Sequence, residues 1–235
     1  MPRHLPDLSQ DRAVASSRPS EIDRFLKKAE EATAVNGRLI FALDATLSRQ
    51  PTWDRACRLQ AEMFGAVSEG LSVQLVYFRG FDECRASKWV ARPQALRDLM
   101  LRIDCRGGQT QIERILKHVR GEAGKTRVGA LVFIGDAVEE NPDSLCRMAG
   151  ELGVLGVPCF MVQEGTDRGC EAAFREIARL SRGAYLRLDE GSADALRNLL
   201  RAVASFAAGG LPALERDATR EGQLLLAQMR GQPPR

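Results

Sequence analysis

Long hydrophobic runs are missing from this sequence of 235 residues. No apolar stretch approaches the roughly 20 residues that a membrane-spanning helix needs, so we expect no membrane span. Residues 1–17 also lack the apolar segment of a secretory signal, which predicts a cytoplasmic location.

The sequence also lacks a large excess of charge of either sign. Lys and Arg total 34 and Asp and Glu total 31, which gives a net charge of +3. A dedicated nucleic-acid-binding domain carries a strong basic excess, so this balance predicts no nucleic-acid partner. The six cysteines contain no CxxC pair and no regular spacing, which argues against a zinc site or a disulfide framework and predicts reduced thiols.

Apolar segments of strand and helix length alternate along the chain. Strands alternating with helices are typical of βαβ units, so we expect a three-layer α/β/α, Rossmann-like fold with a mainly parallel sheet and one short antiparallel edge strand. The predicted strands are 38–44, 71–78, 128–134, 157–163 and 184–188, with the edge strand at 88–90. The predicted helices are 17–31, 53–67, 93–103, 110–120, 142–152, 169–181 and 192–207.

The same pattern divides the chain into parts. Residues 1–17 are polar and are predicted to form a flexible tail, followed by a leading helix within 18–36. The α/β domain is expected over 37–208. The remainder, 209–235, contains a short Leu-rich piece that is either a docking helix or a tail, and the sequence does not decide between them.

Polar residues follow two of the predicted strands and precede a helix between them. Asp44, Thr46 and Ser48 come after the first strand, Asp136 follows the strand at 128–134, and Thr110 follows a glycine pair in Gly-Gly-Gln-Thr. In an open parallel sheet, ligands bind outside the carboxyl ends of the strands. Carboxylate and hydroxyl oxygens suit a hard cation, which predicts Mg²⁺, or else Mn²⁺ or Ca²⁺.

Each of these residues also has a purely structural interpretation. Asp44 is placed to cap the loop before the next helix, Thr110 to cap the helix that follows it, and Asp136 to form a turn. Only their combination favours a metal site. Nearby acids and bases leave similar choices: Glu139 and Glu140 are predicted to form a solvated acidic rim, and Arg49, Arg79 and Arg106 either attract an acidic partner or are ordinary surface cations.

The three loops resemble the metal-ion-dependent adhesion site of von Willebrand factor A-like (VWA) domains. The Asp-X-Ser-X-Ser motif of that family is matched by Asp44, Thr46 and Ser48, its threonine in a glycine-rich loop by Thr110, and its later aspartate by Asp136. The resemblance covers roughly residues 37–207. Two departures are that threonine replaces the middle serine at position 46, and that the third motif reads Ile-Gly-Asp-Ala rather than Thr-Asp-Gly.

This resemblance implies a protein-interaction module. The bound cation would leave one coordination position for an Asp or Glu of a partner protein, and in bacterial members of the family the partner is frequently an AAA+ ATPase or another complex component. The alternative is a scaffold of the same fold that docks without metal.

Enzyme motifs are absent from the sequence. It contains no GxGxxG, no GxxxxGK[ST] and no GxSxG, and the faint match at 121–126 has only two residues between its glycines. A phosphotransferase of the haloacid dehalogenase type needs a second acid two residues after the first, where this chain has Thr46. We therefore expect a protein that is not an enzyme, with a metal-dependent hydrolase or phosphatase as the less favoured alternative.

Overall fold

A computed structural model describes residues 37–67, 70–188 and 192–231. The described residues form one compact unit. The predicted tail at 1–17 and the predicted leading helix at 18–36 lie outside the described residues.

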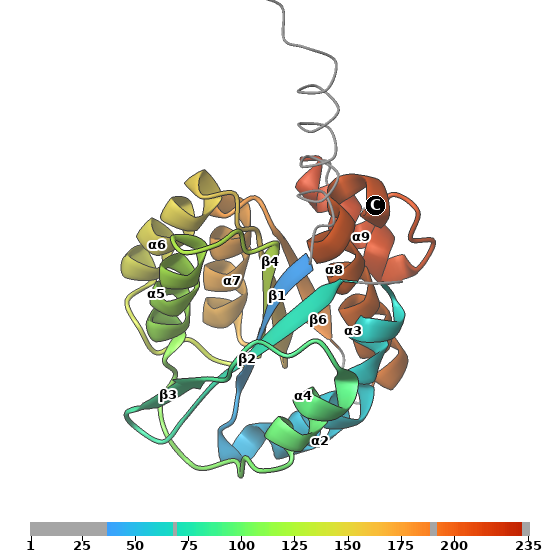
Figure 1. The fold of residues 1–235 in the computed structure, drawn as a ribbon. Helices are drawn as coiled ribbons and strands as arrows, with labels where there is room; N and C mark the ends of the chain where they lie inside the picture. The colour runs from blue at the N-terminus through green and yellow to red at the C-terminus, as the bar shows by residue number, and fades with distance from the viewer. Residues whose placement is uncertain (1–36, 68–69, 189–191, 232–235) are drawn as a thin grey trace, which may run out of the picture. The chain divides into compact units, whose positions relative to one another are not determined.

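A six-stranded sheet in the order β3-β2-β1-β4-β5-β6 forms the centre of this unit (Figure 1). All neighbouring strands are parallel except β3, which runs antiparallel to β2 at one edge. This arrangement confirms the predicted fold class. The strands are β1 (Gly37–Asp44), β2 (Leu71–Arg79), β3 (Glu83–Ala86), β4 (Ala130–Gly135), β5 (Cys159–Glu164) and β6 (Ala184–Leu188).

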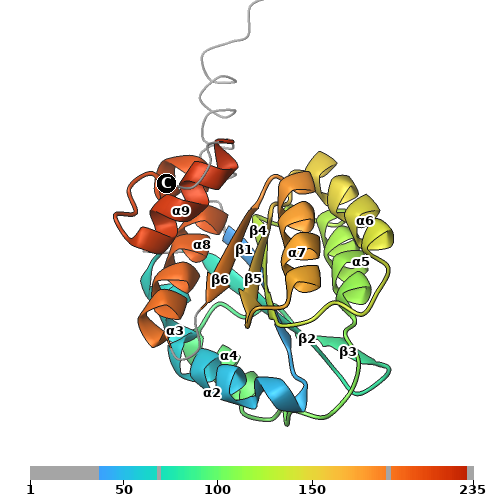
Figure 2. The same cartoon turned by 180° about the vertical axis from the view of Figure 1, so that it is seen from behind.

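Helices cover both faces of the sheet, so the fold has three layers (Figures 1 and 2). On one face lie α5 (Ile112–Ala123), α6 (Pro142–Val154) and α7 (Arg168–Leu180). On the other face lie the short 3-10 helix η1 (Leu47–Arg49), α2 (Gln50–Leu59), α3 (Ala61–Gly65), α4 (Pro93–Met100), α8 (Ala193–Leu214) and α9 (Arg220–Met229).

Strand β1 shows why the central strands read as continuous apolar runs. Leu39, Phe41 and Leu43 belong to the core cluster that packs on α2, α3, α4, α8 and α9, whereas Ile40 and Ala42 belong to the cluster under α5, α6 and α7. Successive side chains of a strand point to opposite faces, so a strand covered on both sides is apolar at every position.

The predicted edge strand at 88–90 is misplaced. The antiparallel edge strand is β3, where Val76 pairs with Ala86 and Arg79 with Glu83, and Val90 makes only an isolated bridge to Val73. The half-exposed edge strand is polar, so hydrophobicity does not mark it.

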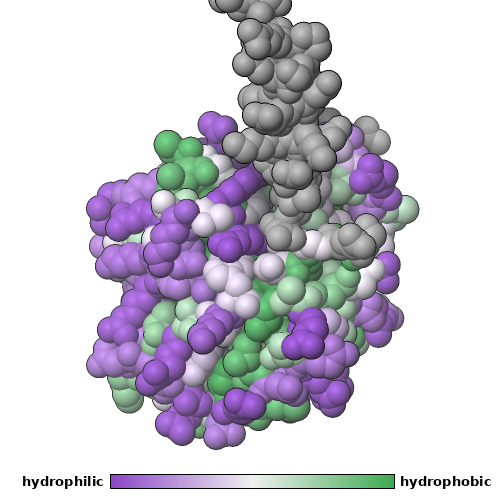
Figure 3. All heavy atoms as spheres, viewed as in Figure 1, coloured by the Kyte–Doolittle hydropathy of each residue, from purple (hydrophilic) through white to green (hydrophobic). Residues whose placement is uncertain are grey.

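Figure 3 shows an apolar strip that crosses this view of the surface over β2, with hydrophilic helices on both sides.

Several predicted helix bounds also change. The helix predicted at 53–67 begins earlier, with Pro51 in its first turn, and is divided into α2 and α3 at Gln60. The helix predicted at 93–103 ends at Met100. The helix predicted at 192–207 continues to Leu214, but Gly210, with φ 64° and ψ −158°, interrupts it, a conformation that glycine adopts without a Cβ clash.

The carboxyl-terminal segment packs on the domain, and the predicted boundary at residue 208 falls inside α8. Leu225 of α9 is fully buried. The Gln228 side chain pairs with the outer edge of β6, accepting from Tyr185 N at 2.9 Å and donating to Tyr185 O at 2.7 Å. This amide satisfies backbone groups that an edge strand otherwise leaves open. Within the described ranges, no helix combines the length and apolar character required to cross a membrane.

Candidate metal and partner-binding site

Three acidic residues stand where three neighbouring strands end. Asp44 is the last residue of β1, Asp136 follows the last residue of β4, and Glu164 is the last residue of β5. The register pairs Leu43 with Ile134 and Gly135 with Gln163, so these acids stand at the same edge of the sheet. The predicted carboxyl-edge location of Asp44 and Asp136 therefore follows directly from the strand order.

Asp44 is a buried carboxylate. Its residue is 3% exposed, and its Oδ1 accepts a hydrogen bond of 2.7 Å from Thr46 N. Burial raises the pKa of Asp44 to about 6, and the nearby Asp136 carboxylate acts in the same direction. Hydrogen bonds from Thr46 and the charge of Arg49 oppose this rise without cancelling it. A buried carboxylate with a raised pKa is typical of a functional site.

Two hydroxyls adjoin this carboxylate. After Asp44 the chain turns through η1, and Thr46 Oγ1 and Ser48 Oγ lie 3.2 Å apart. Thr46 is buried, whereas Ser48 is exposed. The methyl group that distinguishes threonine from serine at position 46 does not prevent the two hydroxyls from meeting.

Arg49 pairs with both of the other two acids. Its Nη2 lies 3.0 Å from Asp136 Oδ2 and its Nη1 lies 2.8 Å from Glu164 Oε2. Glu164 is 4% exposed and is also approached by Arg55 Nη1 at 3.4 Å and by the Thr52 hydroxyl, which donates to Oε2. The guanidinium of Arg49 thus bridges two loops on adjacent strands.

Thr110 lies beside the loop that follows Asp136. Its hydroxyl donates to Glu140 Oε2 at 2.5 Å and accepts from Glu139 N at 2.9 Å. Glu140 also accepts from the backbone N–H groups of Ile112 and Glu113, which belong to the first turn of α5. A carboxylate at this position satisfies free N–H groups and complements the helix dipole.

This arrangement corrects the prediction for the acidic rim. Glu139 is exposed, but its Oε2 accepts from Thr110 N at 2.8 Å, and Glu140 is half-buried and caps α5 from a different loop. Thr110 is placed before α5, as its structural interpretation requires, but Glu140 rather than Thr110 caps the helix. The Thr110 hydroxyl is already engaged both as a donor and as an acceptor.

The glycine pair before Thr110 permits a close backbone approach. A Cβ on Gly108 would lie 2.0 Å from Gly80 O, and Gln109 N donates to the same oxygen at 3.1 Å. On the other side of the pair, a Cβ on Gly107 would lie 3.7 Å from Leu47 Cδ1. The glycine loop therefore fits between the first loop of the site and the β2–β3 turn.

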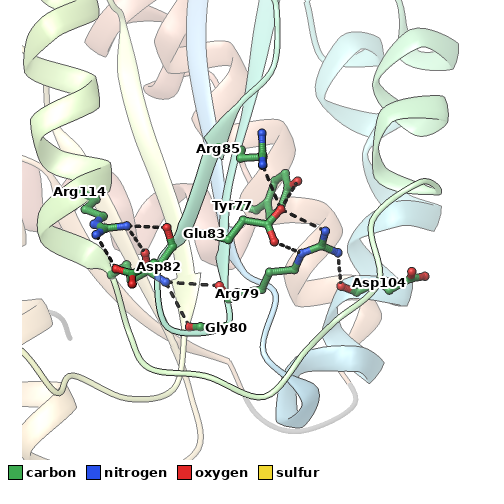
Figure 4. A network of polar contacts seen from close by, with 9 residues as sticks. Tyr77, Arg79, Gly80, Asp82, Glu83, Arg85, Asp104 and Arg114 are labelled. Carbon is green, nitrogen blue, oxygen red and sulfur yellow. Dashed lines mark hydrogen bonds and ion pairs between the residues drawn. The ribbon is translucent and has the colours of Figure 1, made fainter.

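Arg79, Glu83 and their neighbours tie the β2–β3 turn to this edge (Figure 4). Arg79 donates to Glu83 Oε2 at 2.9 Å and to Asp104 O at 2.7 Å, and Arg85 donates to Glu83 Oε1 at 3.0 Å. The hydrogen bonds from Arg79 and then Arg85 lower the pKa of Glu83 to about 2. Arg79, like Arg49, is thus committed to internal acids, whereas Arg106 is exposed.

Comparison with solved structures agrees with this fold. No protein-family model matches the sequence, and no curated protein matches it. Among solved structures, a von Willebrand factor type A protein from Catenulispora acidiphila superposes with a TM-score of 0.62 and 14% identity, over 74% of this chain and 43% of that one. This chain has a VWA-like fold.

Two further VWA structures give the same result. The ArnB paralog VWA2 from Sulfolobus acidocaldarius superposes with a TM-score of 0.52 and 13% identity, over 72% of this chain and 45% of that chain. The SpRpn10 VWA domain superposes with a TM-score of 0.53 and 11% identity, over 72% of this chain and 93% of that domain. This chain thus spans less than half of the Catenulispora and Sulfolobus proteins, and these identities establish the fold alone.

The oxygen donors of this VWA-like domain fit a hard divalent cation in part. Asp44, Thr46 and Ser48 are adjacent, and Asp136 is near enough to influence the pKa of Asp44. Thr110 is not free to join them without leaving Glu140. No group of three or more His, Cys, Asp or Glu side chains within the described ranges is placed to hold a metal ion.

Sequence reasoning missed Glu164. The predicted strand at 157–163 stops one residue before it, so Glu164 stands at the carboxyl end of a strand just as Asp44 does. The rule used for Asp44 and Asp136 applies equally to Glu164. No pattern in the sequence indicates that Arg49 pairs with an acid 115 residues away.

Proposed function

We propose that this chain is a protein-interaction module whose carboxyl-edge site binds a divalent cation, Mg²⁺ above all, and through it an acidic residue of a partner protein. Asp44, Thr46, Ser48 and Asp136 would hold the cation, and Thr110 would join them by exchanging Glu140 for the metal. A bound cation supplies a positive charge with a coordination position open to an outside carboxylate.

The observation that carries this proposal is the buried carboxylate of Asp44. Because burial raises its pKa to about 6, the charged form is poorly compensated by the protein itself. A divalent cation would supply the missing compensation. The two hydroxyls next to it add neutral oxygen ligands, which leave the cation partly uncompensated and therefore attractive to a further carboxylate.

Exposed apolar side chains around the site support a protein as the partner. Leu47 lies between Thr46 and Ser48 and is 64% exposed, and Phe81 in the β2–β3 turn is 73% exposed. The glycine loop described above lies between Leu47 and the turn that carries Phe81. Large apolar groups at the rim of a polar site favour contact with a protein surface over a small polar ligand.

The proposal includes a class of partner and a location in the cell. The resemblance of the motifs makes an AAA+ ATPase the first candidate partner, and the sequence predicts that the protein acts in the cytoplasm. We propose binding rather than catalysis because the donor set of Asp44, Thr46, Ser48 and Asp136 suits cation-mediated recognition, and the sequence carries no nucleophile motif.

Titration calorimetry with Mn²⁺ tests the metal site. The wild-type chain is expected to bind Mn²⁺, and Asp44→Asn is expected to bind at least about tenfold more weakly because a charged ligand is lost. Asp54→Asn, a matched change of charge on the exposed side of α2, should bind like wild type. Absence of binding heat in the wild type, or equal binding by Asp44→Asn, would contradict the proposal.

The alternative is a metal-independent scaffold of the same fold. It is favoured by one observation, that Asp136 already has Arg49 as a counter-ion and Thr110 already has Glu140. In that case capture of a candidate AAA+ partner would be unchanged by a chelator and by Asp136→Asn. Capture that requires both the cation and Asp136 would contradict the scaffold interpretation.

A further inference from the structure

Arg49 belongs to the same loop as three of the proposed metal ligands. It closes η1, where Arg49 N donates to Thr46 O at 2.9 Å, so the turn that carries Thr46 and Ser48 also fixes the base of the Arg49 side chain. That side chain is 17% exposed and reaches Asp136 on one side and Glu164 on the other. A cation of the protein itself therefore contacts one of the carboxylates that the proposed metal requires.

The two acids that bind Arg49 are not equivalent. Glu164 is 5% exposed at its side chain and has other donors, Arg55 and the Thr52 hydroxyl. Asp136 is 25% exposed at its side chain, and within the described part of the chain Arg49 is its one ion-pair partner. Glu164 is thus a fixed anchor for the guanidinium, whereas the contact with Asp136 is the one open to exchange.

A divalent cation at Asp136 would compete with the Arg49 contact. The guanidinium nitrogen lies 3.0 Å from Asp136 Oδ2, so a metal bound to the same carboxylate would face a positive charge at close range. Like charges at such separations repel strongly away from bulk water. The anchor at Glu164 gives Arg49 a place to remain once it has left Asp136.

We infer that Arg49 is a built-in counter-ion of the site, which a divalent cation displaces from Asp136 while its pairing with Glu164 is kept, and that Arg49 thereby sets the metal affinity. This inference rests on the metal-dependent function proposed above. It assigns a role to a residue outside the metal-ligand motif. It also explains how Asp136 is compensated before a cation binds.

Arg55 provides a matched control. Its side chain has the same exposed fraction as that of Arg49, 17%, and it pairs with the same acid, Glu164. It differs in having no ion pair with Asp136. Arg49→Gln and Arg55→Gln remove the same charge from the same neighbourhood, but only the first removes a competitor from a metal ligand.

The experiment is a Mn²⁺ titration of wild type, Arg49→Gln, Arg55→Gln and Arg49→Lys, with circular dichroism to confirm folding. We expect Arg49→Gln to bind Mn²⁺ at least about tenfold more tightly than wild type, which corresponds to 1.4 kcal/mol. Arg55→Gln should stay within about threefold of wild type, because a more distant charge is screened. Arg49→Lys should restore the weaker affinity, because it restores the positive charge.

The outcomes separate this inference from the proposed function. If wild type binds Mn²⁺ and Arg49→Gln binds equally or more weakly, the role of Arg49 is refuted while the metal site stands. If Arg55→Gln tightens binding as much as Arg49→Gln, the effect is one of general charge and the inference is also refuted. If neither wild type nor Arg49→Gln binds, both proposals fail.

A measurement on the wild-type chain covers the case in which Arg49→Gln does not fold. The side-chain Nε–Hε resonance of Arg49, assigned with Arg49→Lys, is expected to shift when Mg²⁺ is added, and the resonance of Arg55 to shift much less. Binding of Mg²⁺ with an unchanged Arg49 resonance would overturn the displacement.

Discussion

At the amino end of the sheet, glycine stands at the start of strands and backbones touch, whereas at the carboxyl end charged side chains follow the strands. A Cβ on Gly129, just before β4, would lie 2.5 Å from Ala207 O, and a Cβ on Gly183, just before β6, would lie 2.0 Å from Cys159 O. At the other end, Asp44 is buried and Asp136 and Glu164 share Arg49.

The amino end of the sheet stabilises the fold, whereas the carboxyl end carries the candidate site. Close backbone contact at the amino end lets α8 lie against β1 and β4 and lets β6 lie against β5. At the carboxyl end, a buried carboxylate with a raised pKa costs folding free energy at neutral pH. We therefore expect substitution of the glycines at the amino end to lower the stability and removal of the buried Asp44 charge at the carboxyl end to raise it.

Gly183→Ala should have the largest effect. The added Cβ meets the backbone of Cys159 rather than a flexible side chain, so β5 and β6 must move apart. We expect a loss of about 3 kcal/mol in the free energy of unfolding, measured by urea denaturation.

Gly150→Ala is the control for that loss. Gly150 lies within α6 with no atom within 4 Å of an added Cβ, so alanine should raise the stability by about 0.5–1 kcal/mol through helix propensity alone. Equal behaviour of the two variants would show that the amino end is not closely packed.

Asp44→Asn should act in the opposite direction, raising the stability by about 2 kcal/mol at pH 7.5 without divalent cations. The amide keeps an acceptor for Thr46 N but removes the buried charge. Under the proposed function the same change weakens metal binding at least about tenfold, so a gain in stability would accompany a loss of binding at one residue.

The raised pKa of Asp44 also predicts how the stability of the wild-type chain depends on pH. The pKa of Asp44 is about 6 in the folded chain and 3.8 ordinarily, so the folded state binds the proton more tightly. The stability of wild type should therefore rise as the pH falls from about 6 to about 4, and its difference from Asp44→Asn should vanish below about pH 4. The free energy of unfolding should be measured across this range for wild type and Asp44→Asn, with the exposed Asp54→Asn as control. A difference between wild type and Asp44→Asn that stays constant with pH would contradict the interpretation.

Glu83→Gln should give the smallest of these effects, a loss of about 1 kcal/mol at pH 7. Arg79 and Arg85 hold the pKa of Glu83 at about 2, below its ordinary 4.5. The stabilisation is complete above pH 4.5 and is lost as the pH falls through 2, the reverse of Asp44. Thermal unfolding of Glu83→Gln tests this prediction, with Asp82→Asn as the control. The Asp82 side chain is 87% exposed, so the loss of stability in Asp82→Asn should be near zero.

The core strands could be predicted because both of their faces are buried, which leaves a continuous apolar run in the sequence. The edge strand β3 could not, because it is half-exposed and carries Glu83 and Arg85. The sequence does not decide whether the carboxyl-terminal piece is a helix or a tail, since its docking depends on Gln228 meeting the Tyr185 backbone, 43 residues away in sequence.

The candidate site divides in the same way. Sequence alone predicts Asp44, Thr46, Ser48 and Asp136 at one edge, because parallel strands in a βαβ fold all end there, and Thr110 at the start of a helix. The partner of each group was decided by the tertiary structure. Glu140 binds Thr110 and Arg49 binds Asp136 because helix and sheet packing brings separate loops within hydrogen-bond distance, and no local pattern records that distance.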